Sequence, residues 1–267
     1  MKNRSTLRIG FVGFGEVNTP RECITERCAA VAQQLVDDGF ELVRAGPVAD
    51  DPAGVQAARA RAELARAEFC AVVICVAGWI PSWAVLAVIE PFRHLPMILL
   101  GLTGWKQGDR FVTTADQAGT TALRQPMAEL GYKFKYVVTP RGSEFPLAQL
   151  RPYLRAAQAA RRLRTASIGM AGYRDMRLYG TLYDGISLKK QIGPEIEHFD
   201  LLELKQSMDT IPDAEVRQMT ETLRARWRFL KDPQPGRLNN RFGSTGPFDA
   251  KSRTEDMLPF RSVMWTA

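Results

Sequence analysis

The sequence predicts an α/β fold: a Rossmann-like, doubly wound parallel sheet followed by a second, incomplete α/β domain. Short apolar runs bounded by glycine or proline alternate with longer segments of helical periodicity. The run CAVVICV at residues 70–76 is apolar throughout, as is typical of a strand buried on both faces of a parallel sheet. With 267 residues, 45% of them hydrophobic, the chain is long enough for one or two domains.

The first predicted domain, residues 1–146, contains five strands that alternate with helices. The strands are expected at residues 7–12, 41–44, 70–76, 96–100 and 133–138. The helices are expected at residues 20–38, 51–68, 82–89 and 119–130. Pro20 suits the first turn of its helix, because its missing N–H would be unpaired there in any case. The glycine-containing stretch after the fourth strand, which includes Trp105, is expected to be a loop.

The second predicted region, residues 147–231, begins with a linking helix at residues 147–164. Strands are expected near residues 166–170 and 195–200, and a helix from Pro212 to about residue 230. This region is short of strands for a complete domain. Residues 232–267 are rich in proline and glycine and have no helical or strand periodicity, so an irregular tail is expected there.

Composition excludes several classes of protein. No apolar run reaches the roughly 18 residues of a membrane span, and the polar N-terminus is not a signal peptide, so a cytoplasmic location is expected. The net charge is +7, but the arginines are scattered over helical faces without a basic, aromatic-containing stripe, so no nucleic-acid partner is predicted. The four cysteines lack zinc-site spacing and are expected to be reduced and buried.

A dinucleotide site is one interpretation of the loop after the first strand. Gly13 and Gly15 match two glycines of the fingerprint, but Asn18 stands where the third is expected. Arg44, at the predicted end of the second strand, would suit a 2′-phosphate. An NADP-dependent reductase therefore remains an alternative, and about ten residues here resemble β-hydroxyacid dehydrogenases.

Aromatic side chains follow the third and fourth strands, at the edge where open α/β sheets bind ligands. Trp79 lies beside Gly78 on a sharp turn, and an indole face suits the apolar C–H side of a sugar ring. For Trp83, just inside a helix, packing is the preferred interpretation. His94 and His198 lack partners at metal-ligand spacing, so structural roles are expected for both, and no self-sufficient catalytic constellation is present.

The longest distinctive motif lies in the second region. It begins with GYRDMRLY at residues 172–179, continues through YDG at residues 183–185 and ends with IGPEIEHFD at residues 192–200. With these motifs, the stretch from Arg8 to about Leu230 resembles the N-terminal half of the L-fucose/L-arabinose isomerase family, in particular its fucose isomerase-like branch. The order of a Rossmann-like domain, a linking helix and a second α/β domain agrees with that family.

The resemblance implies a metal-dependent aldose–ketose isomerase, in which Mn²⁺ holds neighbouring sugar oxygens while a proton moves between adjacent carbons. It also implies a homo-oligomer, in which the first domain of one subunit covers the sugar site of its neighbour. By position, Arg21 and Trp79 correspond to the family's sugar contacts. The family's metal ligands lie in its second half, so no residue here is assigned as a metal ligand or catalytic residue. The chain alone is therefore expected to be inactive and to bind no Mn²⁺.

The irregular composition of residues 232–267 has two possible origins. A shifted reading frame would explain residues 232–267, because permitted codons for residues 255–267 can encode a buried-strand pattern in the next frame. The bases of the gene decide between this hypothesis and a true terminal tail.

The alternative function is a non-catalytic sugar-binding module that uses the same loops. The sequence leaves open which sugar is bound and how large the oligomer is.

Overall fold

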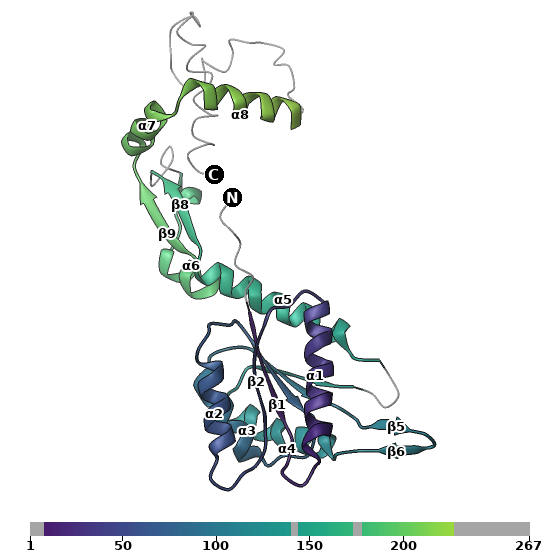
Figure 1. Ribbon diagram of the computed structural model, residues 1–267. Coiled ribbons are helices and arrows are strands. Elements are labelled where there is room, and N and C mark those ends of the chain that lie inside the picture. Colours follow the sequence, from purple (N-terminus) through teal and green to yellow (C-terminus); the bar gives the residue numbers. More distant parts are fainter. Residues whose placement is uncertain (1–7, 140–143, 173–177, 227–267) are drawn as a thin grey trace, which may run out of the picture. The chain divides into compact units, whose positions relative to one another are not determined.

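The structure, a computed structural model, describes residues 8–139, 144–172 and 178–226 (Figure 1). The chain forms two compact units that divide between Leu163 and Arg164. Among the described residues, no helix combines the length and the apolar character needed to cross a membrane.

Unit 1 is built on a five-stranded sheet in which all neighbouring strands are parallel. In spatial order its strands are β2 (Leu42–Val48), β1 (Ile9–Phe14), β3 (Val72–Val76), β4 (Met97–Gly101) and β7 (Phe134–Val138). Its helices are α1 (Arg21–Asp37), α2 (Val55–Leu64), α3 (Ser82–Ile89), α4 (Asp116–Glu129) and α5 (Leu147–Arg164), with a 3₁₀ turn at Glu90–Phe92. This topology confirms the predicted Rossmann-like α/β fold with a parallel sheet.

The sheet separates two hydrophobic clusters, one on each face. Alternate side chains of β3 enter different clusters: Ile74 packs with the cluster of α2, α3 and α4, whereas Val73 and Cys75 pack with that of α1 and α5. Figure 1 shows α1 and α2 on opposite faces of the sheet. Burial on both faces explains why the β3 sequence is continuously apolar. It also shows that α5, which leads out of the sheet, packs on unit 1.

Two local expectations for unit 1 were wrong. The second strand does not end at Arg44 but continues to Val48, so Arg44 lies within β2 opposite Phe11. The stretch that contains Trp105 is not simply a loop. It forms an antiparallel hairpin of β5 (Trp105–Gln107) and β6 (Arg110–Val112), which projects from the sheet in Figure 1. The two residues between these strands are Gly108 and Asp109, a sequence that suits a tight hairpin turn.

Unit 2 contains a two-stranded parallel sheet of β8 (Ser167–Ala171) and β9 (Glu195–Phe199). A 3₁₀ turn at Tyr179–Thr181 and the helices α6 (Gly185–Gln191), α7 (Leu201–Thr210) and α8 (Asp213–Arg226) accompany it. Its buried apolar side chains, among the described residues, are Met208, Val216 and Leu223. The incomplete second domain stays a prediction. The tail at residues 232–267 and residues 173–177 of the motif lie outside the described residues.

Candidate functional site

The carboxyl edge of the sheet brings together three segments: residues 15–20 after β1, residues 77–81 after β3, and residues 113–115 before α4. The chain leaves β1 toward β2 and later continues on the other side of β1 with β3, so the order β2-β1-β3-β4-β7 has its topological switch point between β1 and β3. Open α/β sheets bind ligands in the crevice at this point. The segment at residues 15–20 and the segment that carries Trp79 flank it.

Backbone hydrogen bonds fix Trp79 between its neighbours. Its N–H donates to the carbonyl oxygen of Thr114 at 2.7 Å, and its own carbonyl oxygen accepts from the N–H of Glu16 at 2.8 Å. The preceding residue has no room for a side chain, since a Cβ on Gly78 would lie 2.8 Å from Cδ1 of Ile24. Trp79 nevertheless keeps 38% of its surface exposed. The position therefore combines a fixed backbone with an accessible indole.

Arg21 begins α1 at the same edge. Its Nη1 donates to Oε1 of Gln56 at 3.0 Å, and its Nη2 donates to the carbonyl oxygen of Pro47. These acceptors lie on α2 and β2, whereas Trp79 is bound to Glu16 and Thr114. The structure thus brings Arg21 and Trp79 to one edge but ties them to different segments. Trp83, the other tryptophan considered, is 46% exposed in the first turn of α3.

A buried charged network that the sequence analysis missed lies under these loops. Nη2 of Arg27 donates to Oδ2 of Asp116 at 2.7 Å, and the exposed fractions of the two side chains are 15% and 0%. Nη1 of Arg27 donates to the carbonyl oxygen of Ala77 at 2.7 Å and to Oγ1 of Thr114 at 2.6 Å. The same hydroxyl donates to the Ala77 carbonyl at 2.6 Å. The guanidinium therefore joins α1 to the end of β3 and to the start of α4.

The network extends to the base of the β5–β6 hairpin. The guanidinium carbon of Arg27 lies 4.9 Å from the ring centroid of Trp105, within the range of a cation–π contact. Oδ2 of Asp116 also accepts from the backbone N–H of Gly104 at 3.3 Å. Trp105 thus serves as packing for a buried cation. One signal was available in the sequence: Arg27 interrupts the apolar face that Ile24 and Cys28 define on α1.

The glycines of the suspected dinucleotide loop have a packing role. A Cβ on Gly13 would lie 2.4 Å from Sγ of Cys28, and a Cβ on Gly15 would lie 2.5 Å from Cδ1 of Ile24. Side chains of α1 therefore lie against the backbone at both glycines, and a side chain at either position would collide with them. Arg44, three residues into β2, is also distant along the strand from its carboxyl end at Val48. The position of Arg44 removes the sequence argument for a 2′-phosphate site at the end of the second strand.

The cysteines mostly follow the expectation. Cys28, Cys70 and Cys75 are buried free thiols, whereas Cys23 is only half-buried. A hydrogen bond with Cys28, together with burial, raises the pKa of the Cys75 thiol well above its ordinary value. Burial likewise raises the pKa of Cys70. Because the thiolate is the reactive form, neither of these two residues is suited to nucleophilic chemistry.

The described part of the chain contains no group of side chains that could form a metal site. Nowhere in it do three His, Cys, Asp or Glu side chains gather in a way that suits a metal ion. His198 on β9 instead contacts the Tyr183 hydroxyl through Nε2, and its Nδ1 lies 3.2 Å from the carbonyl oxygen of Gly172. The described residues therefore do not fit Mn²⁺.

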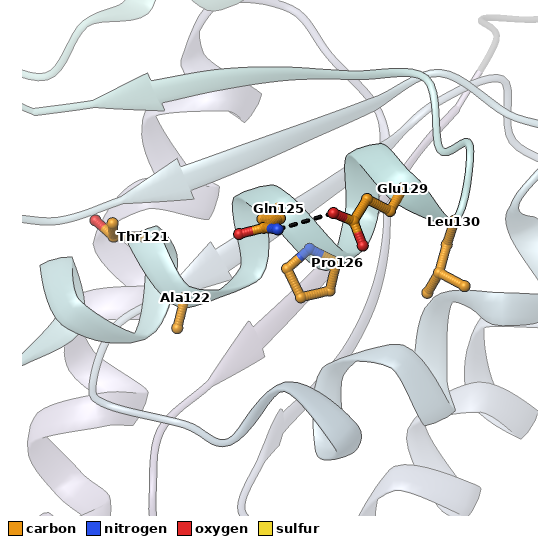
Figure 2. A pocket seen from close by; sticks show the side chains of 6 residues that line it. All are labelled: Thr121, Ala122, Gln125, Pro126, Glu129 and Leu130. Atoms are coloured by element: carbon orange, nitrogen blue, oxygen red, sulfur yellow. Dashed lines mark hydrogen bonds between the residues drawn. The ribbon is translucent and has the colours of Figure 1, made fainter.

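Two open grooves of about 530 Å³ each lie elsewhere on unit 1. Figure 2 shows one of them, which follows one side of α4 and ends at Leu130; Gln125 bonds to Glu129 along it at 2.8 Å. Pro126 lies within this helix and lacks the N–H that would bond to the carbonyl of Ala122. The second groove contains Asp37 and Asp38. Neither groove includes Arg21 or Trp79.

Comparison of the chain with models of protein families and with curated proteins finds no match to either.

Proposed function

We propose that the chain is the N-terminal portion of an aldose–ketose isomerase of the L-fucose/L-arabinose type. In this proposal Arg21 and Trp79 form part of a sugar site that a neighbouring subunit completes. The sequence resemblance described above motivates the proposal. The observation that carries it is the position of Trp79, an accessible indole on a fixed backbone beside the topological switch point of the sheet.

The chemistry of this edge suits a sugar. An indole face packs on the apolar C–H side of a pyranose, and a guanidinium donates to hydroxyl oxygens. Arg21 already donates to Gln56 and Pro47, so a sugar hydroxyl would share or replace these acceptors. In the proposed enzyme a divalent metal would polarise the sugar oxygens, and residues outside the described part of the chain would hold it. The role of the described edge is to bind and orient the sugar.

A sugar-binding module without catalysis is the second candidate function. The hydrogen bonds on both sides of Trp79 favour it, because a preorganised contact strengthens binding without any reacting group. Both candidates predict that the same indole meets the sugar. They differ in whether a neighbouring subunit completes the site for an isomerisation.

The test is a titration of the ¹⁵N-labelled chain with L-fucose and L-arabinose, followed through its indole N–H resonances. Trp79→Phe identifies the Trp79 signal, and Trp83→Phe is the matched control. We expect a saturable shift of the Trp79 signal, with sugar binding weakened by Trp79→Phe and retained by Trp83→Phe. A Trp79 signal that no sugar moves would contradict both candidate functions.

A second measurement tests the expected inactivity of the chain alone. The purified chain is incubated with Mn²⁺ and sugar, and the ketose product is quantified. We expect binding without isomerisation. Isomerisation that requires Mn²⁺ would show that this chain holds a complete catalytic site, which contradicts the expected inactivity.

A further inference from the structure

We infer that Arg27 is a positioning residue for Trp79: its guanidinium holds the Trp79 segment and the base of the β5–β6 hairpin as one unit. The inference rests on the proposed function, because the position of the indole matters for a sugar only if Trp79 binds one. The positioning itself is a property of the protein without ligand. It is therefore measurable separately from sugar binding.

The first contacts of Arg27 lie directly beside Trp79 in the chain. Nη1 donates to the carbonyl oxygen of Ala77, two residues before Trp79, at 2.7 Å. It also donates to Oγ1 of Thr114 at 2.6 Å, and the carbonyl oxygen of Thr114 accepts the N–H of Trp79 at 2.7 Å. Arg27 thus holds both Ala77, which precedes Trp79 in the chain, and Thr114, which accepts the Trp79 N–H.

The other side of the guanidinium is held by a buried charge. Nη2 donates to Oδ2 of Asp116, which is fully buried and which also accepts from the N–H of Gly104. The planar guanidinium has donors in several fixed directions, so a single group can bond to Ala77, Thr114 and Asp116 together. A lysine ammonium at the same position keeps the positive charge but lacks this fixed planar arrangement.

Trp105 adds a contact that ties the hairpin to the same cation. Its ring centroid lies 4.9 Å from the guanidinium carbon of Arg27. The hairpin strand that begins at Trp105 and the segment of Trp79 therefore share one support. Because the Trp79 backbone is already held in place, its indole loses little conformational freedom when a sugar stacks on it. This preorganisation raises sugar affinity without any additional contact.

The experiment uses two variants of the full chain. Arg27→Lys keeps the charge beside Asp116 and removes the planar donor set. Thr114→Val keeps the ion pair and the Thr114 carbonyl but removes the hydroxyl shared by Arg27 and Ala77. Thr220→Val is the matched control, because Thr220 is another buried threonine whose hydroxyl bonds to the Val216 carbonyl of its own helix in unit 2.

The readouts are the indole N–H resonances of Trp79 and Trp83, the dissociation constant for the sugar, and the thermal unfolding midpoint. We expect both site variants to shift and broaden the Trp79 resonance while that of Trp83 stays in place. The sugar dissociation constant should rise roughly five- to tenfold, the effect of losing one or two hydrogen bonds. Thr220→Val should alter neither resonance nor affinity.

The outcomes distinguish this inference from the proposed function. A folded Thr114→Val chain with an unchanged Trp79 resonance and unchanged affinity would overturn the positioning role, even if Arg27→Lys fails to fold. Equal movement of the Trp79 and Trp83 resonances would also overturn it, because it would indicate general loosening. If the Trp79 resonance shifts in both variants but the wild-type chain binds no sugar, the positioning is upheld and the proposed function fails.

Discussion

Asp116 is the most deeply buried charged residue of the network around Arg27, with no exposed side-chain surface. Its carboxylate accepts hydrogen bonds from Arg27, from Gly104 and from the backbone N–H of Gln117 at 2.8 Å. A buried charge is tolerated only when it is paired and hydrogen-bonded in this way. The ion pair therefore adds little net stability by its attraction alone. Removing one partner, however, should destabilise the fold strongly, because the other charge is left without its partner.

Asp116→Asn should destabilise unit 1 by about 3–5 kcal/mol, because it leaves the partly buried Arg27 guanidinium without its fully buried counter-charge. Unfolding in urea, followed by circular dichroism, measures the change. Glu63→Gln is the control, since it removes a carboxylate from the exposed pair with Arg59. That change should cost less than about 0.5 kcal/mol. Similar losses in both variants would show that Arg27 does not depend on Asp116.

Asp38 provides a test of pH dependence. Its hydrogen bond with Arg151 holds the pKa of the Asp38 carboxyl below its ordinary value. A folded-state pKa below the unfolded-state pKa stabilises the fold above the ordinary aspartate pKa, and this contribution is lost as the pH falls through the folded-state pKa. Arg151→Gln should therefore flatten the acid side of the stability profile.

The measurement is the free energy of unfolding between about pH 2 and pH 6, the range in which aspartates titrate. The wild-type and Arg151→Gln chains should differ at the upper end of this range and converge at the lower end. Arg59→Gln, which opens a different surface pair, serves as the control. A constant difference between the wild-type and Arg151→Gln chains at every pH would mean that Asp38 does not titrate differently in the folded state.

At the scale of elements, the strongest sequence signals were accurate. The apolar run around β3 and the segment of α3 lie where they were predicted. Burial on both faces of the sheet leaves β3 continuously apolar, whereas α3 buries only one of its faces. The strands β5 and β6 have three residues each and are largely exposed, so no alternation marks them. The Gly108-Asp109 turn was their one available signal.

Helix α7 was missed for a different reason. Met208 is its one buried residue, so it lacks an apolar stripe. Its start is instead marked by Asp200, whose side chain accepts from the backbone N–H of Glu203 at 2.8 Å. An aspartate at this position followed three residues later by glutamate is typical of a helix N-terminus.

Asp200→Ala should cost α7 about 1 kcal/mol of local stability, because the N–H of Glu203 loses its acceptor. Hydrogen exchange of the amides near Leu204 measures this local opening. Asp200→Asn should retain most of the protection, since asparagine caps helices about as well as aspartate. Equal loss of protection in both variants would point to the charge of Asp200 and not to its cap.

At the scale of the whole chain, the hydrophobic core is concentrated in unit 1. Both clusters consist entirely of residues before Arg164, and α5 supplies Leu150, Leu154 and Ala157 to one of them. The predicted first domain ended at residue 146, ahead of this helix. Sequence pattern alone assigned α5 to a linker, because its contacts are with strands far away along the chain.

A fragment of residues 1–164 should therefore unfold cooperatively in urea, with a midpoint close to that of unit 1 in the full chain. A fragment of residues 1–146 is the matched comparison. It should be markedly less stable, since it uncovers the sheet face that α5 buries. If the shorter fragment is as stable as the longer one, α5 contributes nothing to the stability of unit 1.

For the candidate site, too, the location could be predicted from the sequence, whereas the long-range contacts that support it could not. Its location at the carboxyl edge followed from the order of strands and helices, which placed Arg21 and Trp79 at one end of the sheet. The support beneath it was not predictable, because the partners of Arg27 lie 50 to 89 positions away. Periodicity describes the neighbours of a residue within one element, whereas these contacts depend on how four segments meet.

The same separation has a consequence for the protein as it is made. The ribosome adds Arg27 to the chain before Asp116, and the two residues are 89 positions apart in the sequence. At about 5–20 residues per second, on the order of 5–18 s passes between their synthesis. During that interval α1 carries an arginine with no counter-ion, which disfavours its docking on the nascent sheet. Docking of α1 before Asp116 is made would leave the partly buried Arg27 guanidinium without that counter-charge.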